Sequence, residues 1–241
     1  MKVIILAGGY GTRLGSITSD MPKPMVRIGD EPIIKHIMKI YADHGYKDFI
    51  LALGYKKGVI EEHFKDTSHG WNVTLVDTGL NTLKGGRLKR LEKYLQDDDT
   101  HMLTYGDGVA NINIHELVKF HKAHGNMLTI TGVRPPSRFG ELIEKDGKLL
   151  SFKEKPQASS GLISGGFIVF NKKLLEHLTE DENCDLEYGA FDKLAEQGQI
   201  MVYKHLGDWE CVDTERDLKH LNKIWAEGKA FWKNLGDKKN G

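Results

Sequence analysis

The sequence predicts an α/β fold in which a mostly parallel, mixed sheet is flanked by helices. Short continuous apolar runs, such as residues 3–7 and 49–53, are typical of strands buried on both faces of a sheet. Amphipathic stretches alternate with these runs at the spacing of βα units through the first half of the chain. Glycines follow the runs at positions 8–9, 54 and 106, and ligands bind at that edge of open α/β sheets.

In the first half, each expected strand is a short apolar run, and the clearest helices have apolar residues on one face. Pro32 suits the first turn of a helix, where its missing N–H would be unpaired in any case. The strands are expected at residues 3–7, 49–53, 73–76, 102–105 and 127–133, and the helices at 32–43, 57–65, 87–95 and 114–124.

The second half changes character and predicts a small β-rich subregion. Asp146-Gly147 between two strand-like runs is a hairpin signal, and Gly165-Gly166 within a strand indicates a bulge or a close ligand. Thr214 with Asp217 is typical of a capping box at a helix start. The elements expected here are a hairpin at 142–152, strands at 162–170 and 200–203, and helices at 188–197 and 214–226. Without a repeat or a low-complexity linker, we predict one domain over residues 1–241.

Length and charge exclude several classes of protein. The chain has 241 residues with 34 basic and 34 acidic side chains, so its formal net charge is zero. That balance argues against binding to nucleic acid or to an anionic membrane surface. No apolar run approaches the roughly 18 to 20 residues of a membrane helix, and the first residues lack a signal-peptide pattern. Cys184 and Cys211 have no zinc-site spacing, and we expect a cytoplasmic protein.

A glycine-rich loop after the first strand is a candidate phosphate site. Three glycines would let backbone N–H groups surround an anion, and Arg13 would add a fork-shaped donor. A dinucleotide fingerprint fails because Leu14 stands where glycine is needed, and a Walker motif fails because no Gly-Lys-Ser/Thr follows. A purely structural loop remains an alternative. The candidate residues are Leu6, Ala7, Gly8, Gly9, Gly11, Thr12 and Arg13.

Lys23 and two aspartates extend this candidate site. Lys23 lies between two prolines, which present its ammonium in a fixed direction. Asp107, preceded by Gly106 at the end of an expected strand, has a carboxylate able to hold Mg²⁺ against a phosphate. Asp213 precedes a helix, and it is either a second metal ligand or a helix-capping acid. The two acids can share one metal only if the fold brings them together.

Further candidates lie elsewhere in the chain. Arg87, after Gly85-Gly86, is either an anion contact or a solvated residue of a helix start. Glu154 and Lys155 follow the expected hairpin and could meet sugar hydroxyls and a phosphate. The eleven histidines form neither a zinc-protease motif nor a hydrolase triad pattern that one sequence can support.

These motifs, in this order, resemble the sugar nucleotidyltransferases, which are also called nucleoside-diphosphate-sugar pyrophosphorylases. The leading signature of that family, GGxGTRL followed by PKPM, stands here at residues 8–14 and 22–25. The resemblance runs over nearly the whole chain, and within the family it is greatest to the cytidylyltransferases that act on glucose 1-phosphate. The segments that carry it are residues 75–79, 85–90, 104–109, 138–140, 165–167 and 212–214.

The resemblance implies a Rossmann-like nucleotidyltransferase fold, with residues 1–135 as the nucleotide-binding half and 136–241 as the acceptor-binding half. It implies Mg²⁺-dependent transfer of CMP from CTP to a phosphorylated small-molecule acceptor, a sugar 1-phosphate such as glucose 1-phosphate, with release of pyrophosphate. Asp107 and Asp213 match the metal ligands, and Lys23, Arg13 and Asp107 match the catalytic residues. The matches to nucleotide contacts are Leu6, Ala7, Gly8, Gly9, Gly11, Thr12, Arg13, Lys23, Arg87 and Gly106, and the matches to acceptor contacts are Glu154, Lys155, Gly165 and Gly166.

Three departures from the family pattern leave alternatives open. The insertion before residues 75–79 is shorter, filled by residues 67–72, so assembly into a homo-oligomer is left open. Residues 162–164 (Leu-Ile-Ser) and 187–189 (Glu-Tyr-Gly) differ where the acceptor would bind. The acceptor could therefore be another sugar phosphate or a phosphorylated compound that is not a sugar. A glycosyltransferase and a catalytically silent nucleotide-binding regulator are the rival functions.

Overall fold

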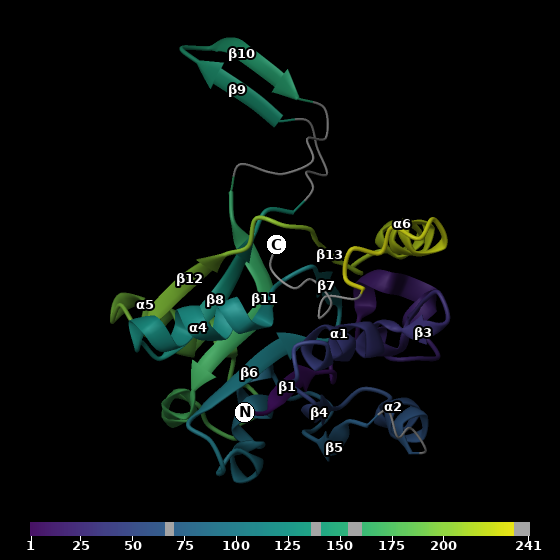
Figure 1. The fold of residues 1–241 in the computed structure, drawn as a ribbon, viewed down its shortest axis with the longest axis vertical. Coiled ribbons are helices and arrows are strands. Elements are labelled where there is room, and N and C mark those ends of the chain that lie inside the picture. Colours follow the sequence, from purple (N-terminus) through teal and green to yellow (C-terminus); the bar gives the residue numbers. More distant parts are fainter. Residues whose placement is uncertain (66–69, 136–140, 154–160, 234–241) are drawn as a thin grey trace.

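The computed structural model describes residues 1–65, 70–135, 141–153 and 161–233, and a seven-stranded sheet lies at its centre (Figure 1). The strand order is β12-β8-β11-β6-β1-β4-β5. Within the described residues, β11 is the one antiparallel strand of this sheet, and all other neighbours run parallel. The predicted mostly parallel, mixed sheet is confirmed. The strands are β1 (Val3–Leu6), β4 (Asp48–Leu53), β5 (Asn72–Asp77), β6 (Thr100–Tyr105), β8 (Leu128–Val133), β11 (Ile163–Asn171) and β12 (Ile200–Lys204).

Helices and short turns connect these strands. The α-helices are α1 (Ile33–Ala42), α2 (Lys57–Phe64), α3 (Lys84–Lys89), α4 (Ile114–His124), α5 (Asp192–Glu196) and α6 (Glu215–Ala226). The tighter or irregular turns are η1 (Thr12–Thr18), η2 (Lys23–Met25), η3 (Glu92–Tyr94), η4 (Lys172–His177) and η5 (Leu186–Phe191). The capping box expected at the start of α6 is present, since Thr214 and Asp217 exchange hydrogen bonds between side chain and backbone.

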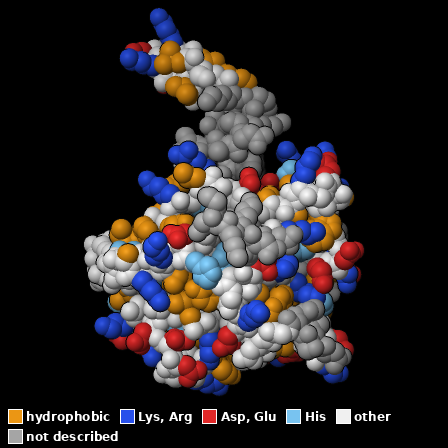
Figure 2. Space-filling model, in the orientation of Figure 1, with side chains coloured by type: hydrophobic (Ala, Val, Ile, Leu, Met, Phe, Trp, Pro, Cys, Tyr) orange, Lys and Arg blue, Asp and Glu red, His pale blue; other side chains and the backbone are white. Residues whose placement is uncertain are grey.

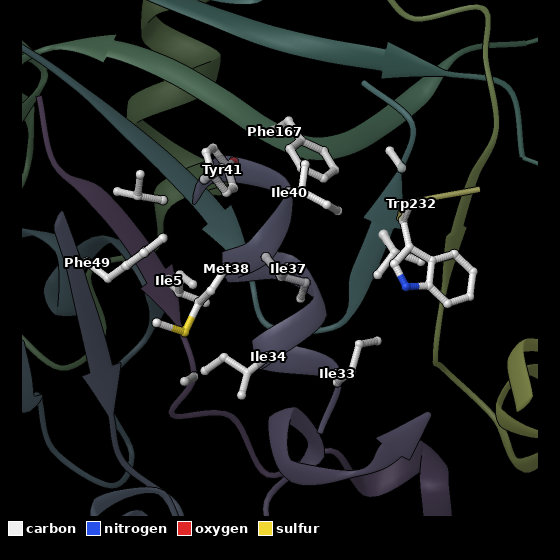
Figure 3. Packing of buried hydrophobic residues seen from close by; sticks show 14 of the residues in the cluster. Ile5, Ile33, Ile34, Ile37, Met38, Ile40, Tyr41, Phe49, Phe167 and Trp232 are labelled. Carbon is white, nitrogen blue, oxygen red and sulfur yellow. The ribbon is translucent and has the colours of Figure 1, made fainter. Parts of the chain in front are cut away.

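Helices cover both faces of the sheet, as predicted. Alternate residues of β1 show this, because Val3 and Ile5 belong to one buried cluster and Ile4 to another. The first cluster contains the apolar face of α1, including Ile37 and Tyr41 (Figure 3). The second cluster contains residues from α3, η4 and α5. The core therefore has two layers, and the sheet separates them.

Two helix predictions were wrong in detail. The helix expected at 87–95 begins three residues earlier, at Lys84, and its last part is the 3₁₀ turn η3. The helix expected at 188–197 is the irregular turn η5 followed by the short helix α5. The side chain of Asp185 accepts hydrogen bonds from the backbone of Glu187 and Tyr188, so this turn starts before the predicted residue.

Three short strand pairs complete the fold. The pairs are β2 (Arg27–Ile28) with β3 (Glu31–Pro32), β7 (Gly108–Ala110) with β13 (Trp209–Cys211), and β9 (Glu141–Lys145) with β10 (Lys148–Lys153). The last pair is the predicted hairpin, and Asp146 (φ 52°) and Gly147 (φ 79°) form its left-handed turn. It projects from the body of the molecule with several apolar side chains exposed (Figures 1 and 2).

Strand β11 begins beside the end of β8. In the register of this antiparallel pair, Ile163 lies opposite Val133. The chain thus leaves the sheet at the end of β8 and re-enters it beside that point. This is the side of the sheet at which the parallel strands have their carboxyl ends. The division into a nucleotide-binding and an acceptor-binding half stays a prediction. Among the described residues, no helix has the length and apolar character needed to cross a membrane.

Candidate active site

A cavity of about 650 Å³ lies at the carboxyl edge of the central sheet. This volume is in the range of small-molecule sites in enzymes. The loop after β1, the end of β6, the start of β11 and the chain around α3 contribute to its wall. The lining residues are Leu6, Ala7, Gly8, Gly9, Tyr10, Gly11, Thr12, Arg13, Lys23, Pro24, Leu80, Asn81, Thr82, Leu83, Lys84, Arg87, Tyr105, Gly106, Asp107, Ser164 and Glu187.

The glycine loop forms one wall of this cavity and lies against the lysine turn. Gly11 has a left-handed backbone (φ 66°), and a Cβ atom there would lie 2.9 Å from Cβ of Lys23. Any other residue at position 11 would therefore separate the loop from η2. All seven loop residues predicted as nucleotide contacts line the cavity, but their contact with a nucleotide stays a prediction.

Lys23 brings the two predicted aspartates together. Its Nζ donates to Oδ2 of Asp107 at 2.6 Å and to Oδ1 of Asp213 at 2.8 Å. Arg13 donates from a terminal nitrogen to the other oxygen of Asp213, also at 2.8 Å. Two carboxylates and two cationic groups therefore form one cluster at the edge of the cavity.

The backbone explains how residues so distant in sequence meet. Asp107 follows β6, and the next three residues form β7, which pairs with β13 just before Asp213. The N–H of Val212 donates to the carbonyl of Asp107 at 2.9 Å, which joins the two acidic segments directly. The fold thus meets the condition that the sequence left open, that the two acids lie together.

Burial and charge act in opposite directions on Lys23. Burial would lower its pKa, but the charges and hydrogen bonds of Asp107 and Asp213 outweigh burial and raise it above the ordinary value. The ammonium therefore stays charged at every physiological pH. Its side chain is 12% exposed, against 72% for Arg13. Lys23 is thus a fixed charge, while Arg13 has freedom to meet a ligand.

The chemistry of this cluster fits a divalent metal ion. Mg²⁺ prefers oxygen ligands and is commonly held by one or two carboxylates, with the remaining positions taken by phosphate oxygens and water. Asp107 and Asp213 offer such a pair beside the glycine loop. Among the described residues, no three His, Cys, Asp or Glu side chains are grouped for metal binding, so substrate oxygens and water would complete the coordination.

The family model for nucleotidyl transferases matches residues 2–239 of this chain. The chain belongs to this family. Two relatives of this nucleotidyltransferase are the glucose-1-phosphate cytidylyltransferase of Salmonella typhimurium, 45% identical, and the probable glucose-1-phosphate cytidylyltransferase of Bacillus subtilis, 41% identical. Each alignment covers 97% of this chain and 99% of the relative.

Solved structures share the fold of the nucleotidyltransferase. HddC from Yersinia pseudotuberculosis, complexed with GMP-PN, is 26% identical with a TM-score of 0.71, over 93% of this chain and 99% of HddC. A putative glucose-1-phosphate thymidylyltransferase from Bacillus anthracis, in complex with a sucrose, has a TM-score of 0.74 at 21% identity, over 100% of this chain and 97% of the other. The predicted Rossmann-like fold class is confirmed.

The arginine predicted to contact the nucleotide is buried in the nucleotidyltransferase. Arg87 is 4% exposed, and its guanidinium donates five hydrogen bonds of 2.7 to 3.1 Å within the protein. The acceptors are the carbonyl oxygens of Gly8, Leu53, Gly79 and Leu80 and the hydroxyl of Thr78. These hydrogen bonds give Arg87 a structural role, and its direct contact with a nucleotide stays a prediction. Through its bond to the carbonyl of Gly8, Arg87 supports the glycine loop.

We expect Arg87→Met to lower the free energy of unfolding by about 3 kcal/mol, because several buried carbonyl oxygens would lose their donor. Urea unfolding followed by circular dichroism measures this change. Arg216→Met, at an exposed position of α6, should change the same quantity by less than about 0.5 kcal/mol. Equal stability of the two variants would contradict the supporting role of Arg87.

The structure describes two of the four residues predicted to contact the acceptor. Gly165 and Gly166 are buried in an irregular stretch of β11, where Gly166 lies against the ring of Tyr105. Neither glycine lines the cavity, whereas the neighbouring Ser164 does, and contact of the glycine pair with an acceptor stays a prediction. The pair brings β11 close to its neighbours. Glu154 and Lys155 lie outside the described residues.

Several lining residues were missed by sequence reasoning. Lys84 donates to Oε1 of Glu187 at 2.6 Å, and so does the hydroxyl of Tyr105. Tyr10 donates to the side-chain oxygen of Asn81 at 2.6 Å, between two segments of the wall. The position of Tyr105, two residues before Asp107 at a strand end, was the available signal. Glu187 belongs to the segment 187–189 that the family resemblance singled out, but its contacts come from distant segments and could not be predicted.

Cys211 lies beside the carboxylate cluster, and the titration of its thiol tests the negative charge of Asp107 and Asp213. Burial first, and then the charges of Asp107 and Asp213, raise the pKa of its thiol to about 12. In the unfolded chain the thiol ionises near its ordinary value of 9.0, whereas the folded protein keeps it protonated. Unfolding thus becomes more favourable as pH rises from about 9 to about 12.

We expect this loss of stability to be smaller in Cys211→Ser, since serine does not ionise in that range. Urea unfolding of the wild type and the variant at about pH 8 and about pH 10.5 measures the difference. Identical pH dependence in both proteins would show that the thiol is not held protonated by its surroundings.

Proposed function

We propose that this nucleotidyltransferase transfers CMP from CTP to glucose 1-phosphate and releases pyrophosphate, with Mg²⁺ as the metal. The observation that carries the proposal is the cluster of Lys23, Arg13, Asp107 and Asp213 at the edge of a cavity bounded by the glycine loop. The choice of CTP and glucose 1-phosphate rests on the names of the relatives from Salmonella typhimurium and Bacillus subtilis. Location in the cytoplasm and assembly into a homo-oligomer stay predictions.

The reaction joins two phosphates, and charge is its main obstacle. A phosphate oxygen of glucose 1-phosphate attacks the α-phosphorus of CTP, and the bond from that phosphorus to the oxygen bridging to the β-phosphate breaks. Such transfers depend on positioning and on neutralising charge more than on covalent catalysis. The attacking phosphate is already an anion, so no general base is needed.

The residues of the cluster supply that neutralisation. The backbone of the glycine loop binds the triphosphate, and Arg13 is exposed enough to follow its oxygens. Lys23, held charged, stabilises negative charge that develops between the α-phosphate and the leaving pyrophosphate. Asp107 and Asp213 would hold the metal, which neutralises phosphate charge when it is bound.

A pyrophosphate-release assay tests the proposal. The purified protein is incubated with Mg²⁺, one of ATP, GTP, CTP or UTP, and one of several acceptors. The acceptors are glucose 1-phosphate, other sugar 1-phosphates and phosphorylated compounds that are not sugars, because residues 162–164 and 187–189 depart from the family pattern. We expect rapid pyrophosphate release from CTP with glucose 1-phosphate. Reaction of UTP alone would overturn the choice of CTP, and reaction of another acceptor alone would overturn the choice of glucose 1-phosphate.

A further inference from the structure

Glu187 is a carboxylate in the cavity wall that the reaction as described does not use. Its Oε1 accepts two hydrogen bonds of 2.6 Å, one from Nζ of Lys84 and one from the hydroxyl of Tyr105. The ammonium of Lys84 also lies 5.4 Å from the centre of the Tyr105 ring. All three residues line the cavity. Two segments from the first half of the chain thus hold one carboxylate from the second half.

The backbone around Glu187 is fixed by its own turn. One oxygen of Asp185 accepts hydrogen bonds from the N–H groups of Glu187 and Tyr188, at 2.8 and 2.9 Å. Such a capped turn leaves the position of the following side chain little freedom. The turn therefore positions the backbone of Glu187 independently of the contact between its carboxylate and Lys84.

The glycine pair after Lys84 brings its helix against this turn. A Cβ atom at Gly85 would lie 2.8 Å from the carbonyl oxygen of Cys184, and one at Gly86 would lie 2.4 Å from that of Asp181. The N–H of Gly86 donates to the same Cys184 oxygen at 2.9 Å. Only glycine permits so close an approach. The sequence motif at 85–86 therefore serves to place Lys84 beside Glu187.

The two oxygens of the Glu187 carboxylate differ in their hydrogen bonds. Oε1 has two donors, whereas Oε2 is shielded from bulk water and has no hydrogen-bond partner within the described part of the chain. A shielded acceptor without a donor is costly, and such groups in native proteins call for a partner. A hydroxyl of a molecule bound in the cavity that Glu187 lines can supply the missing donor.

We propose that Glu187 is a specificity-determining residue that accepts a hydrogen bond from a ring hydroxyl of a sugar bound in the cavity. The proposal rests on the proposed function, in which two sugars enter the site, the glucose of the acceptor and the ribose of CTP. A carboxylate repels phosphate groups, so the neutral, hydroxyl-bearing part of a substrate is the part that it suits. Lys84 and Tyr105 are the positioning residues that hold Glu187 for this contact.

The test compares Glu187→Gln with a matched control, Glu182→Gln, which changes an exposed carboxylate of the same segment. Steady-state kinetics gives kcat and KM for CTP and for glucose 1-phosphate, and calorimetry gives the affinity for each alone. A hydrogen bond to a charged group is worth about 10- to 100-fold in affinity, so we expect KM for one substrate to rise by that factor in Glu187→Gln. The control should behave as the wild type.

The substrate that is affected identifies the sugar. A rise confined to glucose 1-phosphate assigns the hydroxyl to the acceptor. A rise confined to CTP, with a penalty for 2′- or 3′-deoxy-CTP in the wild type that disappears in the variant, assigns it to the ribose. Both results support the proposal. Unchanged KM values with lowered thermal stability would leave Glu187 a structural residue, and a shift in preference between CTP and UTP would assign it to the base; either result overturns the proposal.

Two further measurements distinguish failure of the Glu187 proposal from failure of the proposed function and from misfolding of the variant. If wild-type protein releases no pyrophosphate from CTP with any acceptor, the proposed function fails, while calorimetry with CTP and its deoxy analogues still reports on Glu187. If Glu187→Gln does not fold, the wild type is assayed with deoxyglucose 1-phosphates and deoxy-CTP. Loss of at least about tenfold in kcat/KM for one missing hydroxyl supports the contact, and equal use of all analogues overturns it.

Discussion

Lys23→Ala should lower kcat for pyrophosphate release about a thousandfold while leaving the fold intact. The reason is that the ammonium of Lys23 is a fixed charge, held by hydrogen bonds of 2.6 and 2.8 Å to two aspartates at the edge of the cavity. Without it, negative charge on the transferring phosphate has one cationic side chain fewer, and the two carboxylates repel each other. Kinetics with saturating CTP and glucose 1-phosphate measures the loss.

Two controls accompany this variant. Lys119→Ala removes a lysine that is 77% exposed on α4 and should retain full activity. Circular dichroism and thermal unfolding show whether the fold of Lys23→Ala is intact. If Lys23→Ala keeps activity within a few-fold of the wild type, the catalytic assignment of Lys23 is wrong.

Asp213→Asn should have an effect of similar size, about a thousandfold on kcat, for a different reason. Asp213 accepts hydrogen bonds from both Lys23 and Arg13, so the substitution weakens the anchors of both cationic groups. It also removes one of the two charged oxygen donors expected to hold the metal. The concentration of Mg²⁺ that gives half-maximal activity should therefore rise in this variant.

Metal binding gives a readout of Asp213 that does not depend on turnover. Mn²⁺ binding to the purified protein, followed by electron paramagnetic resonance, should weaken in Asp213→Asn. Asp20→Asn, at an exposed position, should bind the metal as the wild type does. Unchanged Mn²⁺ affinity in Asp213→Asn would remove this residue from the metal site.

The parts of the site that were predictable depend on local sequence. The apolar runs and helix faces predicted the main strands and helices because burial imposes a period on neighbouring residues. Lys23, Asp107 and Asp213 stood out because prolines, glycines and strand ends frame them. Their meeting through β7 and β13 was not predictable, since a three-residue strand has no period that a sequence can show.

The contacts that the sequence did not reveal share one physical cause, which is long-range hydrogen bonding. Arg87 looked like an anion contact, yet its guanidinium reaches the carbonyl of Gly8, 79 residues away. Lys84 and Glu187, 103 residues apart, show the same effect. A charged side chain looks alike in sequence whether it meets a ligand or a distant backbone oxygen. Only the folded chain distinguishes the two.

The pairing of Ile163 with Val133 has a consequence for how the length of the chain between them can change. It holds positions 133 and 163 side by side at the carboxyl end of the sheet, whatever the length of chain between them. Lengthening such a segment costs little chain entropy, about 0.6 kcal/mol for each doubling. A change in chain length between these two positions therefore leaves the sheet, the glycine loop and the lysine–aspartate cluster in place.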